Sequence, residues 1–589
     1  MSVVQKIEAL RESMKKHQIA AVIIPSNDPH QSEYVADRWK YREWISGFTG
    51  SAGTVVVGLQ SAGLWTDGRY YLQGEQELQG TGITLHKTSD PHYLDWLIAT
   101  LPSGSHVAID GDVCSIGQLE KLERRLSPSN IQVNTKLNLV GDVWEDQPSI
   151  PEGEIFTHDV KYAGESRTDK LERIREEMRK QGADLHLIST LDDLAWIFNI
   201  RGADVEFNPV TVAYALIGHE FATLYILPHK VPAAIADELK QQGIACKDYH
   251  DVLKDLNELP PSATILLDPA NCSVKHYKGI NAQKRRGSTI ARAMKAIKNP
   301  TEIDHSKQVM VKDGVAIAHT FYWLEQQLQQ GNTCTEADFA DKLAFHRSQQ
   351  EHYIGESFPA IIGYRANGAI IHYRPQHGSA AEIKADGMLL ADSGGQYLDG
   401  TTDITRTVAL GTPTEEEKLH YTLVLKGHIE LAKARFPAGT TGGQLDILAR
   451  MHLWARGLNY AHGTGHGVGF FLNVHEPPQG FAPPPSERAT TKQLLGMLSS
   501  NEPGYYLEGA YGIRIENLMY TVQSEIEGYY EFENITLYPI DIRLIEESIF
   551  TKGEKAWLNR YHQEVYKKIS PYLDGDIKTW FELKCRGMN

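Results

Sequence analysis

Four carboxylates embedded in apolar, strand-like sequence constrain the fold of this chain most strongly. Asp392 opens the stretch D-S-G-G-Q-Y-L-D-G-T-T-D-I-T-R-T, in which Asp403 follows eleven residues later. Glu502 opens the stretch E-P-G-Y-Y-L-E-G-A-Y-G-I-R-I-E-N, in which Glu516 follows fourteen residues later. Each stretch reads as an apolar strand, a glycine turn and a second apolar strand. Each therefore predicts a hairpin-like unit with one carboxylate near either end.

Burying these four carboxylates in their ionised form requires cations, because a buried charge without a partner is costly. Arg406 and Arg514 lie nearby in the sequence, and Arg514 shares a strand face with Glu516 because side chains alternate along a strand. Two arginines do not balance four carboxylates, whereas two divalent cations do. A hydroxide that bridges two such ions is available at neutral pH, because the ions lower the pKa of water.

Histidines complete the predicted site. The motif H-G-T-G-H-G lies between the two carboxylate stretches and supplies His466. The predicted metal ligands are Asp392, Asp403, His466, Glu502 and Glu516. Oxygen donors with one imidazole and no thiolate suit Mn²⁺, Co²⁺, Fe²⁺ or Zn²⁺ and argue against copper. Three further histidines, His372, His462 and His475, stand in glycine-rich or apolar context, where an imidazole can shuttle protons or donate to a substrate carbonyl.

Bulk properties limit the class of protein. A chain of 589 residues exceeds a single hydrophobic core and predicts roughly two to four domains. The net charge of −16 disfavours nucleic acid and anionic membranes as partners. Five scattered cysteines without a C-x-x-C motif predict reduced thiols. The N-terminus lacks the features of a signal peptide, and no apolar run is long enough for a membrane helix, so we expect a soluble, cytoplasmic protein.

Two helix–strand series precede residue 300. A helical pattern at 7–16 leads to a strand at 20–24, and a second at 168–181 leads to a similar apolar strand, which suggests a duplicated α/β unit. A linker at 146–154 and a helix start at Asn299-Pro300 indicate boundaries. We predict an N-terminal domain at 1–152, a second domain at 153–299 and a final α+β domain with a largely antiparallel sheet at 300–589.

The final domain alternates helices and strands. Helices are predicted at 301–330, 335–350, 414–435 and 441–457. The proline-rich segment 481–488 is predicted to be a surface loop, and 489–500 carries no clear pattern. Segment 477–501 could reshape the rim of the site.

The motifs resemble a known family. D-S-G-G-Q-Y-L-D-G-T-T-D-I-T-R-T, I-I-H-Y, H-G-T-G-H-G-V-G, N-V-H-E, E-P-G-Y-Y and G-I-R-I-E-N are similar to those of the pita-bread metallopeptidases. More narrowly, they resemble the Xaa-Pro aminopeptidases (aminopeptidase P). S-G-F-T-G-S-A-G-T, W-T-D-G-R-Y-Y, A-W-I-F-N-I-R-G and D-V-E-F-N-P-V extend the resemblance over nearly the whole chain. It implies the long three-domain cytosolic form, with two creatinase-like α/β domains before a pita-bread catalytic domain.

The resemblance also implies residue roles. Asp403 and Glu516 would bridge two metal ions, Asp392 would complete one ion, and His466 with Glu502 the other. Glu502 would be the general base, and His462 and His475 would assist catalysis. The residues expected to contact substrate are His372, His462, His475, Arg69 and Arg514. The family usually uses manganese, with cobalt or zinc as alternatives, and usually forms homodimers.

The implied reaction removes the N-terminal residue from peptides with proline in second position, by attack of the metal-bridging hydroxide on the scissile carbonyl. A proline imide lacks an N–H and restricts the preceding residue, so a dedicated pocket is expected. One alternative is a prolidase that cleaves only X-Pro dipeptides. A second, from a different class, is a non-catalytic pita-bread module that binds proteins.

Overall fold

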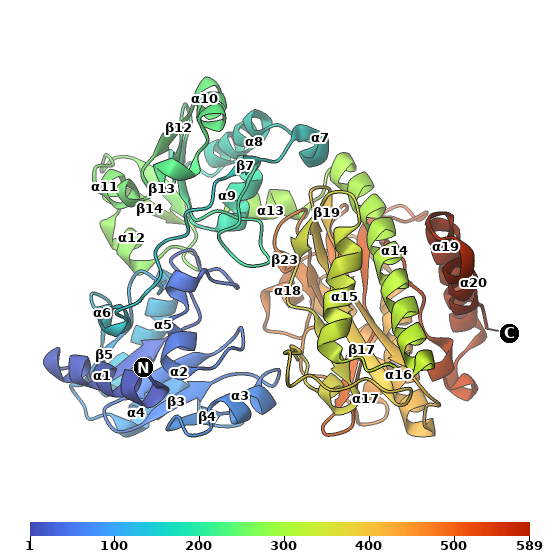
Figure 1. Cartoon of the computed structure of the whole chain (residues 1–589). Helices are drawn as coiled ribbons and strands as arrows, with labels where there is room; N and C mark the ends of the chain where they lie inside the picture. Colours follow the sequence, from blue (N-terminus) through green and yellow to red (C-terminus); the bar gives the residue numbers. More distant parts are fainter. Residues whose placement is uncertain (589) are drawn as a thin grey trace. The chain divides into compact units, whose positions relative to one another are not determined.

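The computed structural model describes residues 1–588 and consists of two compact units (Figure 1). The first contains residues 1–159 and 165–292, and the second contains residues 160–164 and the chain from residue 293. Within residues 1–588, no helix combines the length and apolar character that crossing a membrane requires. The predicted boundaries after residues 152 and 299 stay predictions.

The first unit holds two six-stranded sheets of identical topology. The first sheet has the order β4 (Ile83–His86), β3 (Ala62–Trp65), β2 (Thr54–Gly58), β1 (Ala21–Ile24), β5 (His106–Ala108), β6 (Gln132–Asn134). The second has the order β12 (Ile244–Lys247), β11 (Ala222–Tyr225), β10 (Tyr214–Gly218), β8 (Leu185–Ile188), β13 (Thr264–Leu267), β14 (Gln283–Arg286). In each, the first three strands in chain order pair antiparallel and the other three join by parallel pairing. The predicted duplication is therefore confirmed.

The two halves of this unit meet through equivalent segments. The backbone N–H of Ile116 donates to the carbonyl of Cys272 at 3.0 Å, and that of Val274 donates to the carbonyl of Cys114 at 2.8 Å. The segments I-D-G-D-V-C-S-I and L-D-P-A-N-C-S-V thus bind each other reciprocally. Such an exchange is expected where two copies of one unit pack about a local twofold axis.

The predicted helices are present, with ends shifted by a few residues. They are α1 (Val3–Lys16), α8 (Arg167–Lys180), α14 (Pro300–Gln330), α15 (Glu336–Ser348), α16 (Glu415–Ala432) and α17 (Gly442–Trp454). The start of α14 follows the prediction closely. The Asn299 side chain accepts from the backbone of Glu302, Glu302 reciprocates, and Pro300 fills the first helical position, where a missing N–H costs nothing.

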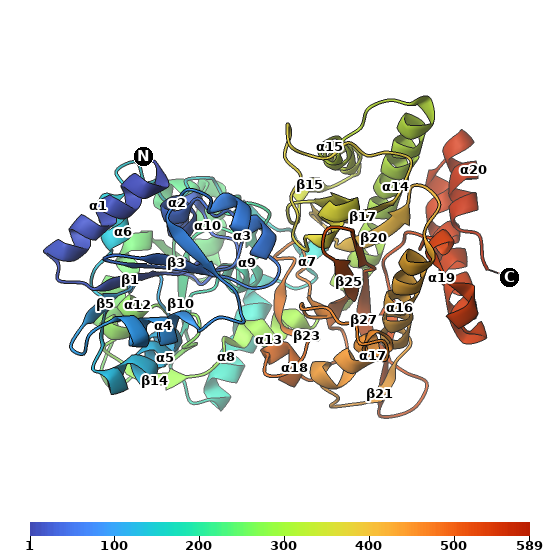
Figure 2. The same ribbon diagram turned by 90° about the horizontal axis from the view of Figure 1, so that it is seen from below.

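The second unit is built on antiparallel sheets covered by helices, as predicted. One sheet has the order β16 (Ile361–Tyr364), β17 (Met388–Ser393), β20 (Ile404–Ala409). Another has the order β21 (Arg435–Pro437), β28 (Tyr529–Asn534), β27 (Asn517–Gln523), β24 (Leu498–Asn501), β22 (Gly465–Gly467), β23 (Glu476–Phe481). Helices α16 and α17 pack side by side (Figure 2). Helix α16 is buried continuously from His420 to Ile429, so it lies between other layers.

One sequence expectation needs correction, and a second needs only its ends adjusted. The stretch from Asp392 to Asp403 is not one simple hairpin. Strands β17 and β20 pair with each other, and the chain between them forms a small ladder, β18 (Gly395–Tyr397) with β19 (Gly400–Thr401), which joins β15 (Tyr353–Glu356). The predicted loop at 481–488 is confirmed at 482–486, where it connects β23 to helix α18 (Glu487–Thr490). Strand β23 tolerates its prolines because it is an edge strand, with one side free of ladder bonds.

Candidate metal centre

The carboxylates among the predicted metal ligands lie where strands begin or end in the second unit. Asp392 lies near the end of β17, and Asp403 directly precedes β20, which pairs with β17 so that Asp392 stands opposite Thr405. Glu502 follows β24, and Glu516 lies between β26 (Tyr511–Arg514) and β27. The backbone N–H of Glu516 donates to the carbonyl of Thr405 at 3.1 Å. The two carboxylate-bearing stretches are therefore joined directly.

Strand β22 adds the imidazole. A register shift between His466 and Gly467 interrupts its pairing with β23, and such bulges re-aim a side chain. Gly465 has no room for a side chain, because a Cβ atom there would lie 2.1 Å from the carbonyl oxygen of Ser500. The glycine lets β22 approach β24, the strand that leads into Glu502.

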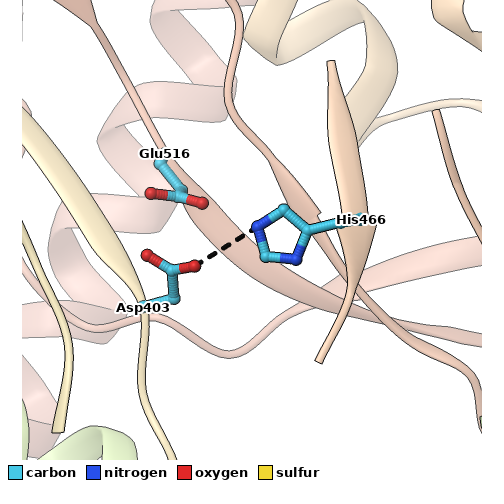
Figure 3. A group of neighbouring side chains, drawn as sticks. All are labelled: Asp403, His466 and Glu516. Carbon is cyan, nitrogen blue, oxygen red and sulfur yellow. Dashed lines mark ion pairs between the residues drawn. The ribbon is translucent and has the colours of Figure 1, made fainter. Parts of the chain in front are cut away.

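Three of the five predicted ligands converge closely. One ligand atom from each of Asp403, His466 and Glu516 lies within 4.8 Å of the other two, and all three residues are buried (Figure 3). The Nε2 atom of His466 lies 3.4 Å from Oδ2 of Asp403 and 3.5 Å from Oε1 of Glu502. The Oδ2 of Asp392 pairs with Arg514, whereas its buried Oδ1 has no hydrogen-bond partner among residues 1–588.

The electrostatics show a shortage of positive charge. Burial raises the pKa values of Asp403 and Glu516 well above their ordinary range, and neighbouring carboxylates raise them further. Burial also raises the pKa of Glu502 to about 7. Burial lowers the pKa of His466, and His475 lowers it further. Each direction means that the ionised groups lack the solvation or partners that they would have in water.

The nearby arginines do not meet this shortage. Arg514 pairs with Asp392 at 2.6 Å, but Arg406 donates instead to the backbone carbonyls of Thr405, Glu516 and Tyr538. The donor set is four carboxylates and one imidazole, which is the chemistry of a site for divalent Mn, Co, Fe or Zn. The residues present therefore fit two divalent cations.

A chain of hydrogen bonds leads from Asp392 to His462. Arg514 donates from Nη2 to Asp392 at 2.6 Å and from Nη1 to the hydroxyl of Tyr506 at 2.7 Å. That hydroxyl lies 2.8 Å from Nε2 of His462. Tyr506 was absent from the sequence prediction. The alternation of side chains along a strand could have indicated it. The hairpin of β25 (Gly504–Leu507) and β26 pairs Gly504 with Arg514, and this pairing places Tyr506 and Arg514 on one face.

The other predicted substrate residues divide between the two units. The ring of His475 lies against that of His466 with centroids 4.3 Å apart. His372 follows Ile371, whose carbonyl accepts from Nη2 of Arg514 at 3.3 Å. Arg69 belongs to the first unit, where Nε and Nη2 each donate to Asp67 at 2.8 Å. Its contact with substrate stays a prediction, as does that of Arg514.

A second cluster of ligand-type residues is already balanced by lysines. Glu430, His452 and Glu554 also bring one ligand atom each within 4.8 Å of the others. The ammonium of Lys426 contacts both carboxylate oxygens of Glu554, at 2.7 and 2.8 Å, and Lys433 pairs with Glu430 at 2.7 Å. The pair of Lys426 and Glu554 ties α16 to α19 (Lys552–Ile569), and His452 of α17 lies beside these ion pairs.

Family comparisons agree with the fold and the site. Residues 304–523 match metallopeptidase family M24, and 528–588 match the C-terminal region of that family. Residues 6–138 and 146–302 match creatinase/prolidase N-terminal domains. The fold and site thus define a metallopeptidase of family M24 that carries two creatinase-like domains, which confirms the predicted architecture.

Similar proteins show which M24 metallopeptidases this chain resembles. A probable Xaa-Pro aminopeptidase P of Laccaria bicolor is 41% identical over 99% of this chain and 93% of the relative. Xaa-Pro aminopeptidase 1 of Dictyostelium discoideum is 40% identical over 98% of this chain and 94% of its own length. The X-prolyl aminopeptidase of Caenorhabditis elegans, described as a cytosolic enzyme with a di-nuclear active site, is 32% identical and superposes over the full length of both chains with a TM-score of 0.95. The chain belongs to the Xaa-Pro aminopeptidase family. Neither the prolidase nor the non-catalytic alternative gains support from these relatives.

Proposed function

We propose that this protein is a metal-dependent aminopeptidase that removes the N-terminal residue from peptides with proline in second position. The observation that carries the proposal is the buried convergence of Asp403, His466, Glu502 and Glu516 within an M24 fold. Names of relatives that are about 40% identical over nearly the whole chain point to the same reaction.

Two divalent ions are proposed to occupy this site. Asp403 and Glu516 would contact both ions, Asp392 would complete one, and His466 with Glu502 would complete the other. When bound, such ions lower the pKa of water and polarise a carbonyl oxygen. Manganese is the proposed metal, and the oxygen-rich donor set with one imidazole suits it.

The protein's own groups would handle the proton and the substrate. Glu502 is the proposed general base, because its side chain is 19% exposed whereas that of Asp403 is 5% exposed. Of these two carboxylates, Glu502 is the one that water and peptide can reach. His462, held by Tyr506, and His475, packed on His466, would donate to the carbonyl oxygen as negative charge develops there. His372 and Arg69 are proposed to contact the peptide.

A peptide-release assay tests this function. The purified protein with Mn²⁺ should release arginine from Arg-Pro-Pro, and a chelator should stop the reaction because the carboxylates need the ions. Added Mn²⁺ should restore it. Activity confined to X-Pro dipeptides would indicate a prolidase instead. No hydrolysis with Mn²⁺, Co²⁺ or Zn²⁺ would indicate a binding module.

We also propose that the protein forms a homodimer through α17. Ile447, Met451 and Trp454 occupy one face of this helix at helical spacing and are 50%, 45% and 47% exposed. An apolar stripe of this kind is self-complementary when two copies of the helix pack about a twofold axis.

Charged substitutions on this stripe should break the dimer. Ile447→Glu/Met451→Glu places two carboxylates at the contact, so sedimentation velocity should change from twice the chain mass of 66.0 kDa to a single chain. Ile526→Glu, at an equally exposed apolar residue elsewhere, is the control and should leave the mass unchanged. A dimer that survives the double substitution would exclude α17 as the interface.

A cytosolic location is proposed as well. The Caenorhabditis elegans relative is described as cytosolic. All five cysteines of this chain are unpaired, which suits a reducing compartment.

A further inference from the structure

The backbone that carries His462 lacks regular secondary structure. Residues 455–464 connect α17 to β22 through turns and irregular chain, and the strand ladder begins only at Gly465. The imidazole of His462 has a fixed partner in Tyr506, but a side-chain contact does not by itself set the path of a loop. Buried carbonyls along such a loop also need donors from outside it.

Arg450, on the buried side of α17, supplies those donors. Its Nη2 donates to the carbonyl of His462 at 2.7 Å, and its Nη1 donates to the carbonyl of Tyr460 at 2.9 Å. Its guanidinium lies over the Tyr460 ring, 4.0 Å from the centroid. Arg450 is buried, so these bonds are shielded from competition with water.

Asp446 holds the arginine and the far end of the loop together. Asp446 lies one helical turn before Arg450, and its Oδ2 accepts a hydrogen bond from Nε of Arg450 at 2.7 Å. Its Oδ1 accepts from the hydroxyl of Thr464 at 2.5 Å. The backbone carbonyl of Thr464 in turn accepts from the N–H of Glu502 at 2.8 Å. The pair therefore fixes both sides of His462.

We infer that Asp446 and Arg450 are positioning residues for His462, and this inference rests on the proposed aminopeptidase function. Their role is to hold the His462 backbone where its imidazole reaches both Tyr506 and the substrate carbonyl. The rigid fork of an arginine can donate to a carboxylate and two carbonyls at once. A lysine keeps the charge and the pairing with Asp446 but cannot span all three acceptors.

Arg450→Lys therefore removes hydrogen bonds to the loop but keeps the positive charge beside Asp446. With Arg-Pro-Pro and Mn²⁺ we expect kcat/KM to fall by about tenfold, because misplacement of a catalytic group by a fraction of an ångström is enough for such a loss. In a His462→Ala background the same substitution should cost less than about twofold, since residues that act through each other are not additive. Arg456→Lys, at an exposed arginine beside the same helix end, should change neither background.

Hydrogen exchange supplies a readout that does not depend on the reaction. Deuterium uptake in peptides covering 458–464 should rise in Arg450→Lys and stay unchanged in Arg456→Lys, while peptides from β20 and β27 stay protected. Equal losses of kcat/KM in both backgrounds, or unchanged uptake in 458–464, would overturn the inference. An inactive wild-type protein would overturn the proposed function, whereas the exchange result would still decide whether Arg450 holds the loop.

Discussion

Glu502→Gln is expected to lower kcat for Arg-Pro-Pro by at least about a hundredfold, the lower range for loss of a general base. Glutamine keeps the size and one oxygen donor of the side chain but cannot accept a proton from water. Metal binding should largely persist, because Asp403, His466 and Glu516 remain. Stopped assays at saturating Mn²⁺, with metal content measured on the same samples, give both quantities.

Glu508→Gln is the matched control for this substitution. Glu508 lies six residues further along, exposed at the turn between β25 and β26, so its loss should leave kcat unchanged. If Glu502→Gln retained most of the turnover with two ions bound, another group would have to serve as the general base. If the Glu502→Gln variant lost both the metal and the activity, the loss of activity would be explained by the loss of a metal ligand and not by the loss of a general base.

The convergence of Asp403, His466 and Glu516 could be predicted because carboxylates within apolar strand sequence need partners of opposite charge once they are buried. A carboxylate at either end of an apolar strand pair must meet a cation, and Asp403 and Glu516 do converge with His466. The ends of helices followed in the same way from local chemistry, as Asn299 and Glu302 show.

Residues that act through packing could not be found by the same reasoning. Tyr506 is an ordinary tyrosine in a strand until the register pairs its hairpin with Arg514 on one face. Arg450 looks like a solvated helix residue until the path of the loop after α17 is known. The ladder of β18 and β19 with β15 was missed because it pairs with a strand about forty residues earlier, a non-local contact that local patterns do not specify.

Asp403→Asn is expected to have opposite effects on stability with and without metal. In the metal-free protein, burial and the carboxylates of Asp392 and Glu502 raise the pKa of Asp403 well above its ordinary range. Removing this charge should stabilise the metal-free fold by roughly 2 kcal/mol, the order of the cost of an uncompensated buried charge. The wild type should gain stability from Mn²⁺ by mass action, and the variant should gain far less.

Activity and thermal unfolding together test this prediction. Bound ions are worth several kcal/mol in the transition state, so losing them should lower kcat by about a thousandfold. The variant should unfold at a higher temperature than the wild type in chelator and at a lower temperature in Mn²⁺. Asp399→Asn is the contrasting control: Asp399 is also buried but pairs with Lys312 at 2.6 Å, so its loss should lower the midpoint in both conditions. A variant at Asp403 that was destabilised equally in chelator and in Mn²⁺ would mean that this carboxylate is structural. Only a metal ligand that repels neighbouring carboxylates in the metal-free protein would make the variant more stable than the wild type in chelator and less stable in Mn²⁺.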